Sequence, residues 1–183
     1  MLAALAWSQS QADMIVKLTG GTRAKIALPD FRGSGSTAQF ADVFNRTVFE
    51  DIQQSGMVDM ASKSFYPLNP PQQESDLRPA PQPRQNNCGG RCLSDWAQPP
   101  VSASYFGFGY LAEQGGQLVA FGHLYNSTVA DINGARLFRK LYNGPVTEEG
   151  AKKVAHEYAA DILKQFGVES LAGSKIYFVS DRG

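Results

Sequence analysis

The chain has 183 residues, 43% of them apolar, and its 17 lysine and arginine residues are balanced by 17 aspartate and glutamate residues. This length suits one globular domain with a core of useful size, and the apolar content excludes a disordered chain. The absence of a basic excess argues against a nucleic-acid-binding protein. No apolar run approaches the roughly 20 residues that a membrane-spanning helix needs, so membrane insertion is not expected either.

The chain opens with an uncharged apolar stretch, Met1 to Trp7, that gives way to small and polar residues. Ser10 and Ala12 have the spacing of the small residues at a signal-peptidase site, although the positively charged start of a secretion signal is absent. We interpret residues 1–12 as the remnant of a signal peptide, with a disordered chain end as the alternative.

Three segments of the first half have the composition of β-strands. They are Met14 to Leu18, Lys25 to Phe31 and Met57 to Ala61. The second is nearly all apolar, which is typical of a strand buried on both faces. The pattern therefore predicts an α/β fold in which helices cover both faces of the sheet.

A helix is predicted between the second and third strands, from about Ala38 to Ser55, because apolar residues recur there at helical spacing. These residues are Phe40, Val43, Phe44, Val48 and Ile52. The hydroxyl of Ser36 or Thr37 can cap the start of the helix, and Gly56 suits a left-handed end.

The turn before this helix, Arg32 to Ser36, is rich in glycine and serine. Such a loop between a strand and a helix can bind phosphate through its backbone amides. It lacks the Gly-Lys-Ser/Thr ending of a P-loop and the third glycine of a dinucleotide-binding motif. A plain turn is the favoured interpretation, and a small-molecule or phosphate-ligand site at residues 32–36 is the alternative.

Most of the ten prolines lie between Tyr66 and Pro100. Proline removes backbone donors, and a low apolar content removes the reason to pack. We predict that residues 69–92 form a mobile surface insertion that can be deleted without loss of the fold. Trp96 is expected to return to the core as an anchor.

The two cysteines, Cys88 and Cys92, are separated by two glycines and an arginine. No second cysteine pair accompanies them, so a four-ligand zinc site is not expected. An oxidising compartment favours a disulfide, whose small ring the two glycines make possible. A bridge this local is expected to contribute little stability.

Residues 104–112 and 117–125 form the clearest pair of strands, with the two glycines of a primed hairpin turn at 115–116. Gly107 and Gly109 alternate with three aromatic residues on the first strand. Glycines at such positions mark the close approach of another backbone or of a helix.

A further strand is expected at residues 136–142, whose cations suit the edge of a sheet. A helix follows over residues 148–166, with Thr147 as its cap and acidic residues in its first turn. A last strand is expected at residues 175–181.

Neither histidine has the companions of a catalytic or metal site. His123 lies in phase with apolar residues of its strand and is expected to be half-buried, whereas His156 lies on the polar side of the last helix and is expected to be solvated. No residue set meets the requirements of a nucleophile with a base. The sequence therefore predicts no catalytic residue, no metal and no cofactor.

The order of these features resembles the N-terminal domain of the TolB family. The resemblance runs from Asp13 to the end of the chain, apart from residues 69–92, which the family pattern does not require. The matching segments are residues 25–31, 53–56, 156–163 and 175–183, together with Tyr125, Leu137 and Phe138. Residues 175–183 carry the most specific match, because they look like the opening strand of the first blade of the family's β-propeller.

The resemblance implies an anticodon-binding-domain-like fold, in which a mixed sheet carries helices on both faces. It divides the chain into the stub at 1–12, an N-terminal domain at 13–168 and the start of a propeller at 169–183. It further implies a non-enzymatic, monomeric, periplasmic domain of the Tol–Pal system, which supports outer-membrane integrity and cell division.

The family binds the inner-membrane protein TolA through the extreme N-terminus of the mature chain, and binds the lipoprotein Pal mainly through the propeller. By position, the TolA-binding residues here are Asp13, Met14, Ile15, Val16, Lys17 and Leu18. A terminal strand can leave its groove and pair with the sheet edge of a partner. An edge strand that never leaves the domain is the alternative.

Overall fold

The computed structural model describes residues 23–80 and 88–167. The strands are β1 (Ala24–Ala27), β2 (Arg32–Gly33), β3 (Val58–Met60), β4 (Tyr105–Gln114), β5 (Gln117–Asn126) and β6 (Arg136–Pro145). The helices are α1 (Ala41–Ser55), α2 (Leu93–Ala97), α3 (Ile132–Ala135) and α4 (Glu148–Lys164). In this part of the chain no helix is long and apolar enough to cross a membrane.

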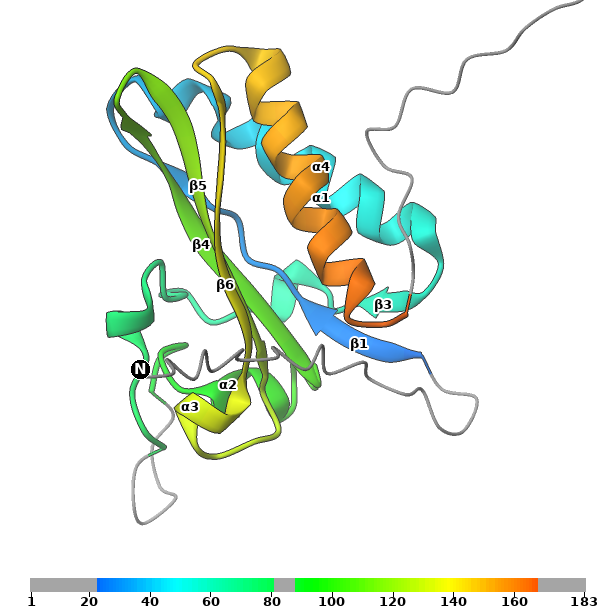
Figure 1. Cartoon of the computed structure of the whole chain (residues 1–183). Coiled ribbons are helices and arrows are strands. Elements are labelled where there is room, and N and C mark those ends of the chain that lie inside the picture. Colours follow the sequence, from blue (N-terminus) through cyan, green and yellow to red (C-terminus); the bar gives the residue numbers. More distant parts are fainter. Residues whose placement is uncertain (1–22, 81–87, 168–183) are drawn as a thin grey trace, which may run out of the picture.

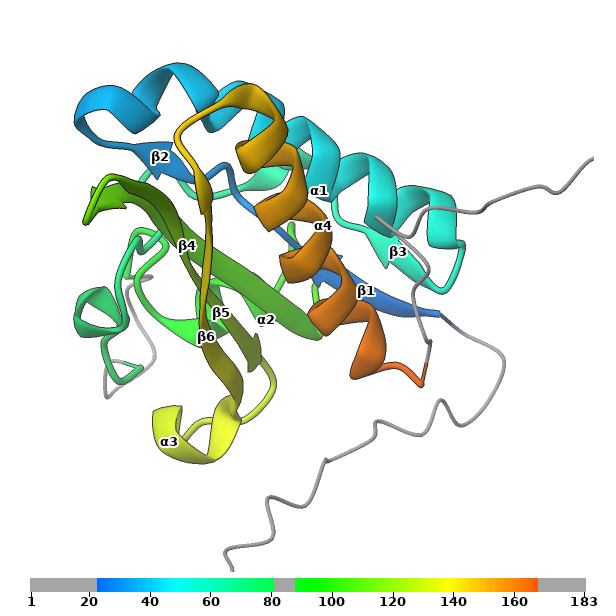
Figure 2. The same cartoon turned by 45° about the horizontal axis from the view of Figure 1, so that its top comes forward.

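The strands form one six-stranded mixed sheet in the order β3-β1-β4-β5-β6, with β2 paired with β4. β1 and β2 both run parallel to β4, whereas β4, β5 and β6 form an antiparallel meander. Figures 1 and 2 show α1 and α4 together on one face of the sheet and α2 on the opposite face. The predicted three-layer α/β/α class is confirmed.

Pro29 divides the single strand expected in its region into β1 and β2. Proline has no N–H to give to a ladder, and the amides on either side bond to side chains instead. The N–H of Leu28 donates to the hydroxyl of Tyr66 at 3.0 Å, and the N–H of Phe31 donates to the side-chain oxygen of Asn45 at 2.8 Å. These two hydrogen bonds connect the break between β1 and β2 to the layers on both faces of the sheet.

The first helix begins with a 3₁₀ turn, Gly35–Phe40, that continues into α1. The expected cap was Ser36 or Thr37, but the structure places Ser34 at the cap position. Thr37 lies inside the turn, where its hydroxyl donates to the carbonyl oxygen of Ser34 at 2.8 Å. Gly56 ends α1 with a φ of +63°, as predicted.

The glycines of the central strands leave room for aromatic side chains that pack on the face of the sheet covered by α1 and α4. A Cβ on Gly109 would lie 2.6 Å from the ring of Phe31, and a Cβ on Gly122 would lie 2.6 Å from the ring of Tyr158 on α4. The close approach predicted from the glycines is confirmed. The hairpin turn at 115–116 also has the expected form, because both of its glycines have positive φ angles, +57° and +74°.

The sheet separates two apolar clusters. The larger one lies between the sheet and the helices α1 and α4, and the smaller one lies on the opposite face around Trp96, Phe106 and Phe108. Leu77, from the region expected to be a mobile surface insertion, belongs to the smaller cluster with an exposed fraction of 8%, and Cys92 at the end of that region is also fully buried. The described parts of residues 69–92 therefore pack against the second face of the sheet, and that the segment can be deleted without loss of the fold stays a prediction.

Candidate functional site

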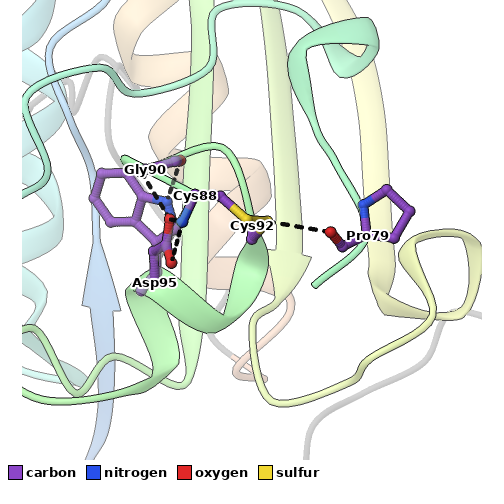
Figure 3. The surroundings of a disulfide bond; sticks show 6 residues. Pro79, Cys88, Gly90, Cys92 and Asp95 are labelled. Atoms are coloured by element: carbon purple, nitrogen blue, oxygen red, sulfur yellow. Dashed lines mark hydrogen bonds between the residues drawn. A yellow bond between two sulfur atoms is a disulfide. The ribbon is translucent and has the colours of Figure 1, made fainter. Parts of the chain in front are cut away.

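The segment between β3 and β4 places two groups of hydrogen-bonded polar residues on the second face of the sheet. Its first feature is the disulfide between Cys88 and Cys92, which Figure 3 shows beside α2. The carboxylate of Asp95 accepts hydrogen bonds from the N–H of Cys88 at 3.0 Å and of Gly90 at 2.7 Å. Gly89 and Gly90 have positive φ angles, 64° and 102°, so the disulfide loop folds its amides around this one carboxylate.

Trp96 joins the disulfide loop to the sheet. Its indole N–H donates to the carbonyl oxygen of Gly90 at 2.8 Å, and its ring stacks on Phe106 with 4.0 Å between centroids. The side chain is fully buried, which confirms its expected role as an anchor. The disulfide loop therefore rests on the apolar cluster of the second face.

We expect loss of the disulfide to destabilise the domain by about 2 kcal/mol, because the chain-entropy relation gives roughly that value for so small a ring. Cys92 is fully buried, and the carbonyl oxygen of Pro79 lies 3.3 Å from its sulfur, so a serine there has an acceptor for its hydroxyl. Urea denaturation of the double alanine and double serine variants of Cys88 and Cys92 measures the loss without and with that hydroxyl. The expected loss is larger than the small contribution inferred from the sequence.

The control for this experiment is the wild-type protein with and without reductant. Alkylation followed by intact-mass measurement should add no label before reduction and two labels after it. Two labelled thiols in unreduced protein from an oxidising compartment would contradict the disulfide.

The second feature is a carboxylate held by three donors from the sheet. Glu74 Oε1 accepts from the hydroxyl of Tyr125 at 2.7 Å and from Arg136 Nη1 at 2.6 Å, while Glu74 Oε2 accepts from Arg139 Nη1 at 2.8 Å. Burial alone would raise the pKa of Glu74, but these hydrogen bonds outweigh it and lower the pKa to about 2. Glu74 is therefore ionised throughout the physiological range.

A β-bulge makes this convergence possible. Tyr125 on β5 lies opposite Arg136 on β6, and His123 lies opposite Arg139, with a register shift between the two pairs. The two β5 residues are two positions apart, whereas their β6 partners are three apart. Residues three apart on a regular strand point to opposite faces, and the extra residue of the bulge restores both arginines to one face.

His123 lies beside these charges without taking part in their hydrogen bonds. Its exposed fraction is 5%, so it is buried rather than half-buried as expected, and its ring stacks on Phe108 with 4.9 Å between centroids. Among the described residues, Nδ1 of His123 is the buried side-chain atom without a hydrogen-bond partner. Burial lowers the pKa of His123 to about 4; Glu74 opposes this shift, and the two arginines add to it.

His156 was expected to be solvated, but it lies between two helices. Its Nδ1 is 2.6 Å from Oδ2 of Asp51, so that the pair links α4 to α1. The described residues contain no group of three or more histidine, cysteine, aspartate or glutamate side chains that could hold a metal ion.

The glycine- and serine-rich turn at residues 32–36 already uses amides that a phosphate would need. The N–H of Arg32 donates to the side-chain oxygen of Gln72 at 3.2 Å, and the N–H of Ser34 donates to the carbonyl oxygen of Leu111 at 3.2 Å. These bonds favour the interpretation of the segment as a plain turn.

The predicted TolA-binding residues, Asp13 to Leu18, lie outside the described residues, as does the last expected strand at 175–181. The structure therefore tests neither of them. Sequence reasoning missed Glu74 and its two arginine partners. The cations of the strand at 136–142 gave no signal for this contact, because arginines at an exposed edge strand need no acidic partner.

Comparison with known proteins gives structural relatives alone. No protein-family model and no curated protein sequence matches the chain. TolB from Acinetobacter baumannii is similar with a TM-score of 0.53 and 17% identity, over 81% of this chain and 30% of that one. The hypothetical protein CT253 from Chlamydia trachomatis gives 0.50 and 9%, over 79% and 98% of the two chains. PelC from Paraburkholderia phytofirmans gives 0.44 and 16%, over 79% and 89%.

At these identities the likeness is one of fold. The chain spans about 30% of the length of the TolB structure that it matches. Since the expected class, sheet and helical layers are all present in the described residues, the chain has a TolB-like α/β fold.

Proposed function

We propose that this chain is a periplasmic protein-interaction domain of a Tol–Pal-type envelope system, and that it is not an enzyme. The observation that carries the proposal is the likeness of its fold to TolB. In that system the domain would support outer-membrane integrity and cell division through contacts with other envelope proteins.

Two properties of the chain agree with a periplasmic location. The Cys88–Cys92 bridge belongs in an oxidising compartment, where such disulfides form and persist. The small residues Ser10 and Ala12 follow an apolar stretch with the spacing of a signal-peptidase site. Export is thus part of the same proposal.

We assign partner binding to residues 13–18, which correspond by position to the TolA-binding segment of the family. The segment contains a short apolar run, Met14 to Val16, and one cation. Such a segment can add a strand to the sheet edge of a partner, which gains main-chain hydrogen bonds from it. Binding of Pal would require a propeller encoded after this chain.

The test compares two truncated chains, one beginning at Asp13 and one beginning at Thr19. Isothermal titration with the cognate C-terminal domain of TolA should detect binding to the first chain and none to the second. Thermal unfolding of both chains is the control, and their midpoints should agree closely, because both chains keep all the described residues of the two apolar clusters.

Equal binding by the two chains would move the interface to another surface of the domain. No binding by either chain, or by the longest natural chain, would contradict the assignment to TolA. A separate check is the coding sequence downstream of Gly183, where the proposal expects repeats of roughly 40 residues, as in propeller blades.

A further inference from the structure

Tyr125, Arg136 and Arg139 form a set of donors that belongs entirely to the sheet. They come from two adjacent strands, and their positions are fixed by the β5–β6 register and its bulge. Bulges often redirect a side chain next to a functional site. The sheet therefore fixes the positions of these three donors independently of Glu74.

Glu74 reaches the donors from a segment outside the sheet, which has other attachments to the domain. Besides the bonds of Glu74, Gln72 accepts from the N–H of Arg32, and the N–H of Arg78 donates to the carbonyl oxygen of Arg91. Pro71 and Leu77 are the buried apolar side chains of this stretch. The carboxylate thus adds a charged contact to a segment that these side chains and hydrogen bonds also hold on the sheet.

Two of the three donors, the arginines, are also accessible from solvent, whereas Tyr125 is fully buried beneath Glu74. The side chains of Arg136 and Arg139 are 37% and 63% exposed, compared with 23% for Glu74. They lie on β6, which is the last strand of the sheet, and no further strand pairs with its outer edge within residues 23–80 and 88–167. An acidic group from outside can approach the same guanidinium groups.

We propose that Tyr125, Arg136 and Arg139 form a carboxylate-binding site, in which Glu74 is an internal ligand that a carboxylate from another molecule can replace. Two guanidinium groups and a phenol that all donate to one carboxylate match the acceptor geometry of an acid, and their two positive charges disfavour a cation. The ligand class is a carboxylate, supplied by a small organic acid or by an acidic side chain of a protein partner. The site contains no residue of the segment 13–18, to which the proposed function assigns partner binding.

The test is chemical rescue of Glu74→Ala, which empties the site and leaves its donors unpaired. At pH 7 and equal ionic strength, sodium acetate should raise the melting temperature of this variant above its value in sodium chloride. The expected rise is about 2 °C at an acetate concentration three times the dissociation constant. If the variant does not fold in chloride, recovery of its far-ultraviolet circular dichroism in acetate is the readout.

The matched control is Glu113→Ala, which removes the carboxylate that accepts from Ser36 at a surface position. Acetate should stabilise Glu113→Ala and the wild-type protein to the same small extent, because both keep Glu74. Adding Arg139→Ala to Glu74→Ala should abolish the specific effect. An equal effect of acetate on all variants, or one that survives loss of Arg139, would overturn the proposal.

A second arm distinguishes the source of the carboxylate. The blocked tripeptide acetyl-Thr-Glu-Thr-amide is compared with acetate and with the same peptide containing glutamine in place of glutamate. The same rise in melting temperature at a lower concentration of the glutamate peptide than of acetate identifies a protein ligand. A stronger effect of acetate identifies a small acid, and equal action of the two peptides would contradict a carboxylate site.

Discussion

Replacing Trp96 by alanine is expected to destabilise the domain by about 3–5 kcal/mol, the range for removal of a large buried aromatic side chain. The ring is fully buried against Phe106, and the variant would also leave the carbonyl oxygen of Gly90 without its donor. The measurement is the free energy of unfolding from urea denaturation at pH 7.

Two variants bracket this result. Trp96→Phe keeps an aromatic ring on Phe106 but loses the indole N–H, so its loss should be intermediate. Leu68→Ala changes a side chain that is 90% exposed, and its effect should stay within about 0.5 kcal/mol. A loss for Trp96→Ala as small as that for Leu68→Ala would mean that the second layer contributes little to the fold.

The second large effect is a loss of stability in acid caused by His123. The pKa of His123 is about 4 in the folded protein because of burial, and about 6.5 in the unfolded chain. The unfolded state therefore binds the proton first, and stability falls as the pH decreases from about 6.5 to about 4. The linkage relation gives a loss of about 2 kcal/mol between pH 7.5 and pH 5, and about 3 kcal/mol by pH 4.

The comparison protein is His123→Phe, which keeps a ring against Phe108 and cannot be protonated. Its unfolding free energy should change less between pH 7.5 and pH 5 than that of the wild-type protein, by about 2 kcal/mol. Measurements stop at pH 5, because Glu74 has a folded pKa of about 2 and its own contribution is lost only as the pH falls below about 4.5. Identical pH dependence in the two proteins would contradict the assignment to His123.

Elements governed by local rules could be predicted from the sequence. The hairpin at Gly115 and Gly116, the cap of Thr147 on α4 and the left-handed end of α1 at Gly56 all depend on neighbours in the chain. The close passage at Gly109 could also be inferred, since a missing side chain in a buried strand needs a spatial reason.

The candidate carboxylate site depends on tertiary structure and could not be predicted. A proline-rich composition with few apolar residues indicates a weak tendency to pack. A few buried residues such as Leu77 are nevertheless enough to hold a segment on a sheet. The bulge has no marker in the sequence. A regular strand would place Arg136 and Arg139 on opposite faces of the sheet. The pairing of His156 with Asp51 likewise follows from how α4 packs on α1, not from its neighbours on one helix.

The position of β4 in the sheet also predicts the order in which the strands pair during folding. β1 and β2 both take β4 as a parallel partner, although more than seventy residues of chain separate them from it. In a chain that emerges from its N-terminus first, we expect these two strands to pair with β4 late, and among the described strands β1–β3 is the pairing that can form before it. β4, β5 and β6 follow one another closely and form short-range contacts, which close quickly. We therefore expect the later half of the chain to provide the sheet edge on which the earlier half is completed.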